Sequence, residues 1–362
     1  MKSHTLNDLT QSFEQKKIFI TGHTGFKGGW LSSILDLCDA ELYGYALEPP
    51  TTPSFYEAVG ISEYFQKEWI ADIRDQENLT QALLEVEPEV IIHLAAQPLV
   101  RASYEEPVET IQTNVLGTAN LLNAARQLES LKAILIITTD KCYENKEWVW
   151  GYREHDQLGG HDIYSSSKAC TELITTSFAR SFFNQEGSPK IATARAGNVI
   201  GGGDWAKDRL VPDIIKGLKS SGVHLRSPQA VRPWQHVLEP LSGYLSLVIA
   251  LLGTHKTDFE GAWNFGPDDI DVRTVEELTK LMAQELQSNN WSVQETNRHE
   301  PHETTLLKLD SSKAKMYLPW KPKLRLESCV QYTAEWYQLW ENDSTLIRDF
   351  TKSQIQSYFN EA

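Results

Sequence analysis

Cysteine is scarce in this chain, and no two cysteines lie close together. The four cysteines are Cys38, Cys142, Cys170 and Cys329. They form no Cys-x-x-Cys pair, so neither a zinc site nor a disulfide framework is indicated. Unpaired thiols are typical of a reducing compartment. No segment reaches membrane-spanning length, and the first residues lack the apolar core of a signal peptide. The sequence therefore predicts a cytoplasmic protein with no metal site and no membrane partner.

Positive charge is also in short supply. The chain has 34 Lys and Arg residues against 49 Asp and Glu residues, a net charge of -15. Phosphate-rich partners would be repelled overall, which excludes nucleic acid and anionic membranes as expected partners. A local basic pocket for a small phosphate ligand remains compatible with this charge.

Strand-like and helix-like segments alternate in the first part of the chain. Strands are predicted at 16–22, 40–47, 68–73, 89–96, 131–137 and 190–199. Helices are predicted at 26–38, 75–86, 107–127 and 163–184. Several of the strands are apolar on both faces, which indicates a parallel sheet covered by helices on both sides. The predicted fold class is α/β, a Rossmann-type doubly wound parallel sheet.

The rhythm changes near Gly201, where loop-rich segments such as GGGDWAKDRLVPD and SPQAVRPWQHV begin. With 362 residues, the chain is longer than one compact core usually supports. We expect a dinucleotide-binding domain with the catalytic residues at 13–200. Residues 201–362 would mainly form a smaller α/β substrate lobe, with some segments returning to the first domain. A ligand cleft is expected beyond the carboxyl ends of the strands, between the two parts.

The segment TGHTGFKGGW places glycines at positions 22, 25 and 28 between the first strand and the first helix. Gly22 can turn the chain, Gly25 lets the backbone approach a pyrophosphate, and Gly28 allows close helix–strand packing. The helix N-terminus offers N–H groups to the phosphates. No arginine occurs between this loop and Arg74, so a 2′-phosphate would lack a local cation. We therefore expect NAD rather than NADP, although Glu48 lies slightly late for the usual ribose contact.

Tyr164 and Lys168 are four residues apart and would share one helix face. A nearby ammonium favours the phenolate, so we expect Lys168 to lower the pKa of Tyr164 and make it a usable base. The spacing alone is weak evidence, because Tyr317 and Lys321 match it too, with a proline between them. Position distinguishes the first pair, which follows a strand-end loop in the dinucleotide-binding half.

Several motifs together resemble the extended short-chain dehydrogenase/reductase family: TGHTGFKG, DIRD (72–75), HLAAQP (93–98) and YSSSK (164–168). Longer segments resemble its sugar-nucleotide 4,6-dehydratases, and among them the cytidine-linked branch: TTDKCYENKEWVWGYRE, GNVIGGGDWAKDRLVPD and RPWQHVLEPL. The resemblance implies bound NAD, CDP-glucose as substrate, a homodimer formed through long helices, and a part in making deoxysugars for the lipopolysaccharide O-antigen.

The resemblance also implies catalytic roles. Tyr164 would take the proton of the sugar 4-hydroxyl while Thr139 hydrogen-bonds that oxygen. Asp140 would protonate the leaving 6-hydroxyl, provided burial keeps the carboxyl neutral. Lys141 stands where thymidine-linked enzymes carry glutamate; it would either remove the C5 proton or stabilise the enolate by its charge. Lys168 would hydrogen-bond the nicotinamide ribose.

Binding residues follow from the same motifs. Cofactor contacts are expected from Gly22, Thr24, Gly25, Phe26, Lys27, Gly28, Asp72, Ile73, Leu94, Ala95, Ala96, Asn114, Tyr164 and Lys168. Asn198, Arg209 and Arg232 are expected to bind the sugar nucleotide, because a guanidinium suits a diphosphate. Three alternatives are a sugar-nucleotide 4-epimerase, a dehydratase acting on another nucleotide sugar, and a non-catalytic NAD-binding regulator on the same fold. Asp140 and Lys141 argue against the epimerase, which needs no acid and base there.

Overall fold

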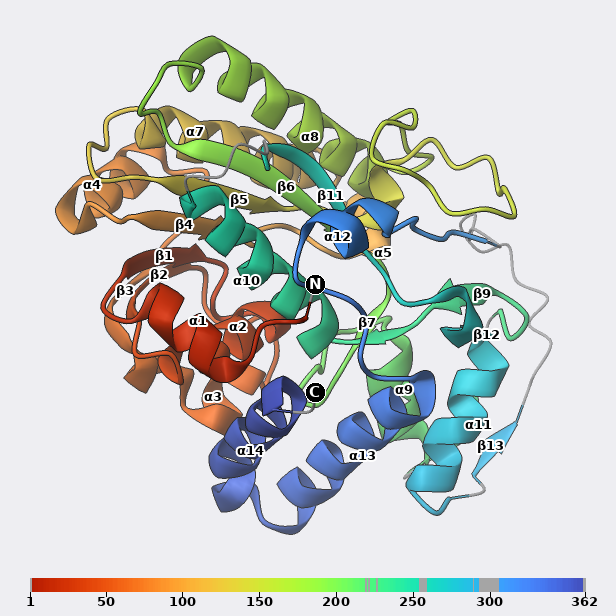
Figure 1. Cartoon of the computed structure of the whole chain (residues 1–362). Helices are drawn as coiled ribbons and strands as arrows, with labels where there is room; N and C mark the ends of the chain where they lie inside the picture. The colour runs from red at the N-terminus through yellow and green to blue at the C-terminus, as the bar shows by residue number, and fades with distance from the viewer. Residues whose placement is uncertain are drawn as a thin grey trace.

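The computed structural model describes residues 2–218, 220, 222–225, 227–253, 259–288, 290–292 and 306–360. At its centre is a seven-stranded sheet in the order β11-β6-β5-β4-β1-β2-β3 (Figure 1). Every neighbouring pair of strands in this sheet is parallel. The strands are β1 (Lys17–Thr21), β2 (Glu41–Ala46), β3 (Phe65–Ile70), β4 (Val90–His93), β5 (Ala133–Ile137), β6 (Lys190–Ala196) and β11 (Gly261–Phe265).

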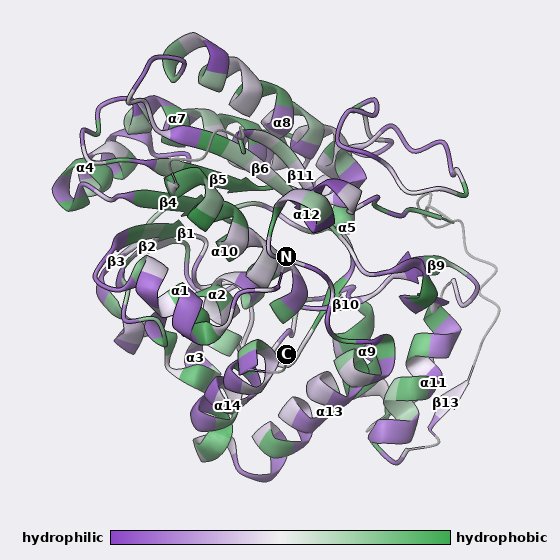
Figure 2. Ribbon diagram, in the orientation of Figure 1, coloured by the Kyte–Doolittle hydropathy of each residue, from purple (hydrophilic) through white to green (hydrophobic). Residues whose placement is uncertain are grey.

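Two layers of helices cover this sheet, because successive side chains of its strands point to opposite faces. Ile18 and Ile20 of β1 pack into one hydrophobic core, and Phe19 between them packs into the other. Figure 2 shows the apolar strands between the two layers. The first layer contains α1 (Leu6–Phe13), α2 (Phe26–Asp36), α10 (Leu238–Leu252) and α14 (Ile347–Asn360). The second contains α4 (Gln76–Val86), α7 (Gly117–Ala125) and α8 (Ile163–Phe182). The predicted doubly wound fold is confirmed.

The other elements lie mostly around the carboxyl ends of the central strands (Figure 1). Three small sheets pair β7 (Val199–Ile200) with β10 (Gln235–His236), β9 (Val231–Pro233) with β12 (Val272–Thr274), and β8 (Val223–His224) with β13 (Trp291–Ser292). The helices are α3 (Phe55–Val59), α5 (Val100–Glu105), α6 (Pro107–Ile111), α9 (Leu210–Leu218), α11 (Val275–Glu285), α12 (Ser312–Tyr317) and α13 (Leu326–Asn342). Short helical turns are η1 (Ile61–Tyr64), η2 (Gln112–Leu116), η3 (Asp140–Cys142), η4 (Asp269–Asp271) and η5 (Ser344–Leu346).

Some predicted boundaries are wrong. The strand expected at 68–73 is β3, which begins and ends three residues earlier, because Gln66 and Lys67 near its start are polar and exposed at the sheet edge. The strand expected at 89–96 ends at His93, where the backbone turns into the ligand-facing loop. The helix expected at 107–127 is interrupted by a π-helical turn, η2, between α6 and α7.

C-terminal segments return to the first half of the chain. Strand β11 pairs with β6 at the edge of the central sheet, and α14 packs against α2 and α3. Trp336 of α13 stacks on Phe55 at a ring distance of 5.9 Å, and Phe55 stacks on Trp30 at 5.2 Å. The strand order reverses between β1 and β4, which opens a crevice at their carboxyl ends, where ligands bind in folds of this type.

Candidate active site

The glycine loop joins β1 to α2 at this crevice. Gly22 has a φ of +77°, and a Cβ there would lie 2.6 Å from the amide nitrogen of Ala95. At Gly28 a Cβ would lie 2.2 Å from the carbonyl oxygen of Gly22. Gly25 differs, because its Cβ would meet nothing closer than 3.4 Å. Packing within the protein therefore requires glycine at 22 and 28 but leaves room at Gly25, where a phosphate could approach the backbone.

The neighbouring strand ends complete this side of the crevice. The Thr24 hydroxyl donates to the carbonyl of Leu47, just after β2. After β3, the Asp72 carboxylate accepts hydrogen bonds from the Arg74 guanidinium, which lowers the pKa of that carboxyl. The Ile73 side chain is buried against Gly117 rather than open to a ligand. The Asp72 carboxylate is therefore engaged by Arg74 at the place expected for an adenine.

The loop after β4 is held by Asn114 from the π-helical turn η2. The Asn114 amide donates to the Gln97 carbonyl at 3.1 Å and to the Ser167 hydroxyl at 2.9 Å, and its oxygen accepts from the Gln97 amide. The Leu94 and Ala95 amides bond Thr21 at the end of β1. Ala96 follows in the same partly buried loop. These contacts place Asn114 between the cofactor crevice and α8.

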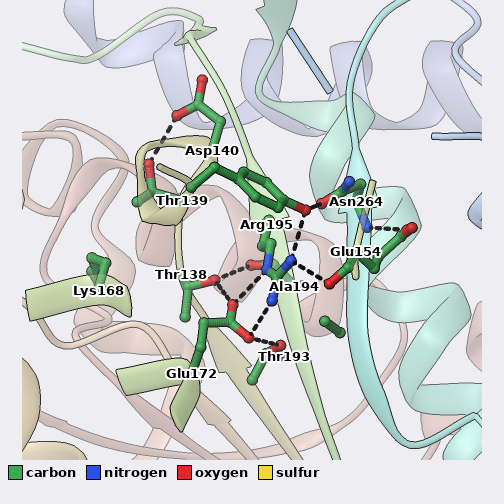
Figure 3. A network of polar contacts seen from close by, with 12 residues as sticks. Thr138, Thr139, Asp140, Glu154, Lys168, Glu172, Thr193, Ala194, Arg195 and Asn264 are labelled. Carbon is green, nitrogen blue, oxygen red and sulfur yellow. Dashed lines mark hydrogen bonds and ion pairs between the residues drawn. The ribbon is translucent and has the colours of Figure 1, made fainter. Parts of the chain in front are cut away.

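Strand β5 and helix α8 bring four predicted catalytic residues together. Thr139 and Asp140 follow β5, and Tyr164 and Lys168 lie in the first two turns of α8. The Lys168 ammonium donates to the carbonyl of Ile137 at 3.1 Å, which fixes the helix against the strand end. The Thr139 hydroxyl donates to Asp140 Oδ1 at 3.0 Å (Figure 3). All four side chains are buried.

Burial dominates the protonation of this cluster. It raises the pKa of Asp140, although Lys141, Thr139 and Arg232 act in the opposite direction. The second carboxyl oxygen of Asp140, Oδ2, is buried without a hydrogen-bond partner. A neutral carboxyl with a free oxygen is the form in which an aspartate can donate a proton.

The expectation that Lys168 lowers the pKa of Tyr164 is wrong for the protein by itself. Burial raises the pKa of Tyr164 to about 12, more than the Thr139 hydrogen bond lowers it. Burial also lowers the pKa of Lys168 to about 8, with Glu172 acting against this. Desolvation disfavours both charged forms, and it is the largest cause of both pKa shifts.

Three further basic residues act electrostatically on the groups of this cluster. Burial, together with the charges of Arg209 and Lys168, lowers the pKa of Lys27 to about 7. Arg232 is buried close enough to Asp140 to lower the pKa of its carboxyl. Arg209 forms an ion pair with Asp204 at 3.2 Å. The two predicted arginines of the C-terminal part therefore reach the same site.

Two predicted residues lie at the edges of this cluster. The carbonyl of Asn198 accepts from the Gln235 amide at 3.1 Å, and its side chain is partly buried after β6. Lys141 borders a cavity of about 140 Å³. The cavity is lined by Lys141, Tyr143, Glu144, Asn145, Glu147, Gly160, His161, Asp162, Ser165 and Leu307. Lys141 thus stands between Asp140 and a polar cavity.

Two buried polar groups near the predicted catalytic residues are not predicted from the sequence. Tyr244 of α10 lies fully buried with an unpartnered hydroxyl, and burial raises its pKa. Glu172 pairs with Arg195 of β6 beneath the end of β5. A signal existed for Glu172, which follows Lys168 by four residues on the same helix face; none existed for Tyr244.

A glycine loop at the switch point, a strand-end threonine and a Tyr-x-x-x-Lys helix define an extended short-chain dehydrogenase/reductase. The family model described as GDP-mannose 4,6 dehydratase matches residues 19–333. The CDP-glucose 4,6-dehydratase of Salmonella typhimurium is 46% identical over 354 residues, covering 96% of this chain and 97% of the relative. The chain therefore belongs to this family of sugar-nucleotide 4,6-dehydratases.

Solved structures share the fold at lower identity. The dTDP-glucose 4,6-dehydratase of Streptomyces venezuelae, solved with NAD, has a TM-score of 0.75 and 19% identity, covering 92% of this chain and 99% of that one. The UDP-glucose 4-epimerase of Thermus thermophilus, also with NAD, has a TM-score of 0.73 and 22% identity, covering 88% and 98%. Among the residues described, no helix is long and apolar enough to cross a membrane.

Proposed function

We propose that the protein converts CDP-D-glucose to CDP-4-dehydro-6-deoxy-D-glucose and water, acting as a CDP-glucose 4,6-dehydratase. The observation that carries this proposal is Asp140, a buried carboxyl with a raised pKa and an unpartnered oxygen beside Thr139 and Tyr164. An oxidation or epimerisation at C4 needs no such acid, whereas loss of the 6-hydroxyl does. The identity to the Salmonella enzyme supports the choice of substrate.

The residues around the crevice fit NAD. Gly25 leaves an open approach to the backbone at the N-terminus of α2, where N–H groups can bond a phosphate. At the end of β2, Leu47 and Glu48 are exposed and offer no cation to a 2′-phosphate. The Arg74 guanidinium is bonded to Asp72, 2.6 Å from its carboxylate. NAD supplies reversible hydride acceptance, so the overall reaction has no net change in oxidation state.

The side chains divide the proton transfers between them. Tyr164 takes the proton of the 4-hydroxyl as hydride leaves C4, and Thr139 holds that oxygen. The new 4-ketone would acidify C5–H, and its proton would pass to a base, one of the two candidate roles of Lys141, while Asp140 would protonate the departing 6-hydroxyl as water. Bound NAD would supply hydride to C6, C5 would regain a proton, and the proton taken by Tyr164 would balance the one given by Asp140. Asn198, Arg209 and Arg232 hold the sugar and its diphosphate, within a substrate lobe formed mainly by residues after Gly201.

Lys141 has two candidate roles that one variant separates. If Lys141 removes the C5 proton, Lys141→Met abolishes exchange of solvent deuterium into C5 of the 4-keto intermediate. If it stabilises the enolate by charge, exchange persists at a reduced rate, and Lys141→Arg restores part of it because the charge is kept. Deuterium incorporation is read by NMR.

We further propose a cytoplasmic homodimer. Helices α6 and α8 and the turn η2 pack side by side, and they carry exposed apolar residues. These are Val108, Ile111, Leu116 and Leu173. Exposed apolar residues on neighbouring helices suit a two-fold interface in which the same surface meets its copy.

The substrate assignment is tested with a panel of nucleotide sugars. The purified protein is supplied with NAD and with CDP-, dTDP-, UDP- or GDP-linked glucose, and products are followed by NMR. We expect a 4-keto-6-deoxy product from CDP-glucose and much slower turnover of the others. Absence of that product would overturn the proposal, a galactose-linked product would indicate an epimerase, and no product from any sugar would indicate a non-catalytic NAD-binding protein.

A further inference from the structure

A buried ion pair lies directly beneath the catalytic strand end (Figure 3). The Glu172 carboxylate accepts two hydrogen bonds from Arg195, each at 2.9 Å. The Thr138 hydroxyl donates to Oε1, and the Thr193 hydroxyl donates to Oε2 at 2.6 Å. Both carboxylate oxygens are therefore fully engaged inside the protein, with Glu172 only 3% exposed.

Arg195 carries the network further. Its third nitrogen, Nη1, donates to the Tyr143 hydroxyl at 2.6 Å and to the carbonyl of Glu154 at 3.1 Å. The Tyr143 hydroxyl donates in turn to the side-chain oxygen of Asn264 in β11 at 2.8 Å. The guanidinium thus links β6 to the loop that follows the catalytic residues and to the edge strand.

The two anchors bracket the catalytic segment. Thr138 immediately precedes Thr139, Asp140 and Lys141, and Tyr143 follows them after one residue. One end of the segment is bonded to Glu172 and the other to Arg195. A short backbone segment with both ends tied to one rigid pair has little freedom to move its side chains.

Stability alone does not explain such a pair. Removing two charges from water is costly, and well-packed apolar residues usually stabilise a core as well or better. A fully hydrogen-bonded ion pair instead fixes geometry, because each bond specifies a direction. The catalytic side chains must be positioned with this precision, because displacement of a reacting group by about 1 Å can slow the reaction on the order of 100-fold.

We propose that Glu172 and Arg195 are positioning residues for the dehydration, acting as a clamp that holds Asp140 and Lys141 through Thr138 and Tyr143. The proposal rests on the function proposed above, because it assigns the clamp to the step in which those two side chains act. Neither Glu172 nor Arg195 touches the substrate in this role. The clamp acts on the elimination of water more than on sugar binding.

Single-hydroxyl variants test the clamp without leaving a buried charge unpaired. Thr138→Val and Tyr143→Phe each remove one anchor and keep the ion pair. We expect a fall of at least about tenfold in kcat, with KM changed less than about twofold, because a positioning defect appears in the reacting state. Hydrogen exchange at the amides of residues 139–142 should accelerate in both variants.

Tyr152→Phe is the matched control. The Tyr152 ring stacks on Tyr143 at 5.1 Å, but its hydroxyl bonds Asn145 and the Lys146 amide rather than Arg195. Tyr152→Phe should lose about as much stability as Thr138→Val and Tyr143→Phe, while its kcat stays within about twofold of the wild type. Losses in Thr138→Val and Tyr143→Phe that merely equal those in Tyr152→Phe would overturn the clamp.

The two proposals fail in different ways. If the wild type turns over none of the nucleotide sugars, the proposed function fails, and the exchange measurement still tests whether the anchors restrain residues 139–142. If the wild type is active but both anchor variants keep wild-type kcat and exchange rates, the clamp is wrong and the function stands.

Discussion

In the proposed mechanism Asp140 and Tyr164 require opposite protonation states at the start of the reaction, yet burial raises the pKa of both. For Asp140 this is the useful direction, because a general acid must begin protonated. For Tyr164 it is a barrier, because a base must lose its proton first. The positive charge of an oxidised nicotinamide would act against that barrier, which couples activation of the tyrosine to cofactor binding.

Two variants separate the oxidation from the loss of water. Tyr164→Phe should slow hydride transfer from C4 at least about 100-fold, because the base is absent. Asp140→Asn should allow hydride transfer but slow water loss to a similar degree, so that NADH accumulates. Rapid-mixing absorbance of NADH measures both steps. Normal product formation by Asp140→Asn would remove Asp140 from the acid role.

The raised pKa of Asp140 also predicts how stability depends on pH. The unfolded carboxyl ionises near its ordinary pKa while the folded one stays protonated, so the wild type loses stability as pH rises through the raised value. The loss is at most ~1.4 kcal/mol per pH unit. Asp140→Asn removes this dependence. Its thermal midpoint relative to the wild type should therefore rise with pH.

Asp72→Asn is the control, because the pKa of Asp72 is shifted in the opposite direction to that of Asp140. Arg74 lowers the pKa of Asp72, so its stabilising contribution is present above the ordinary carboxyl pKa and is lost only as pH falls through the lowered value. Between about pH 5 and pH 8 the stability difference between Asp72→Asn and the wild type should stay flat. A flat difference for Asp140→Asn as well would show that Asp140 ionises normally.

At the scale of elements, the glycine loop contains one glycine required for packing, Gly28, and one expected to contact NAD, Gly25. Gly28→Ala should cost more than about 2 kcal/mol, because its Cβ would overlap backbone atoms of Gly22 and His23. Gly25 has φ −79°, an ordinary conformation with open space beside it. Gly25→Ala should therefore cost less than about 1 kcal/mol and weaken NAD at least about tenfold. Thermal unfolding and fluorescence titration with NAD provide the two measurements.

Unchanged NAD affinity in Gly25→Ala would contradict the placement of the pyrophosphate at this loop.

The element boundaries differ in how well the sequence predicts them. The apolar strands β1 and β5 and the helix α8 carry strong periodic signals, and the structure places them where the sequence predicts. Strand β3 has a polar edge pattern, and η2 has no sequence signature of its own. The bounds of both are therefore set by packing against neighbouring elements.

At the scale of the whole molecule, the proposed dimer is tested by a substitution that places a charge in its interface. In a two-fold interface, Leu173→Arg would bring in two arginines, one from each subunit, facing an apolar surface. We expect this variant to be monomeric at micromolar concentration by light scattering after size exclusion. Met316→Arg is the control, because Met316 is 69% exposed on α12, which is not part of the proposed interface. Equal masses for Leu173→Arg and the wild type would contradict the helix interface.

The sequence by itself determined the local elements and the residue patterns on which the proposed chemistry rests. Apolar strands, a glycine loop and a Tyr-x-x-x-Lys helix each depend on residues close together in the chain, so their patterns are visible in the sequence. It also placed Asp140 and Lys141 after a strand end, where the resemblance assigned them roles. Lys141 in particular pointed to the cytidine-linked branch.

Only the tertiary structure decided what depends on distant residues. The pKa directions of Asp140 and Tyr164 follow from burial by elements spread over the chain, and the sequence alone gave the wrong direction for Tyr164. The clamp joins Thr138, Glu172 and Arg195 with residues as far away as Asn264. Such contacts leave no periodic pattern, because long-range packing places side chains by geometry rather than by spacing along the chain.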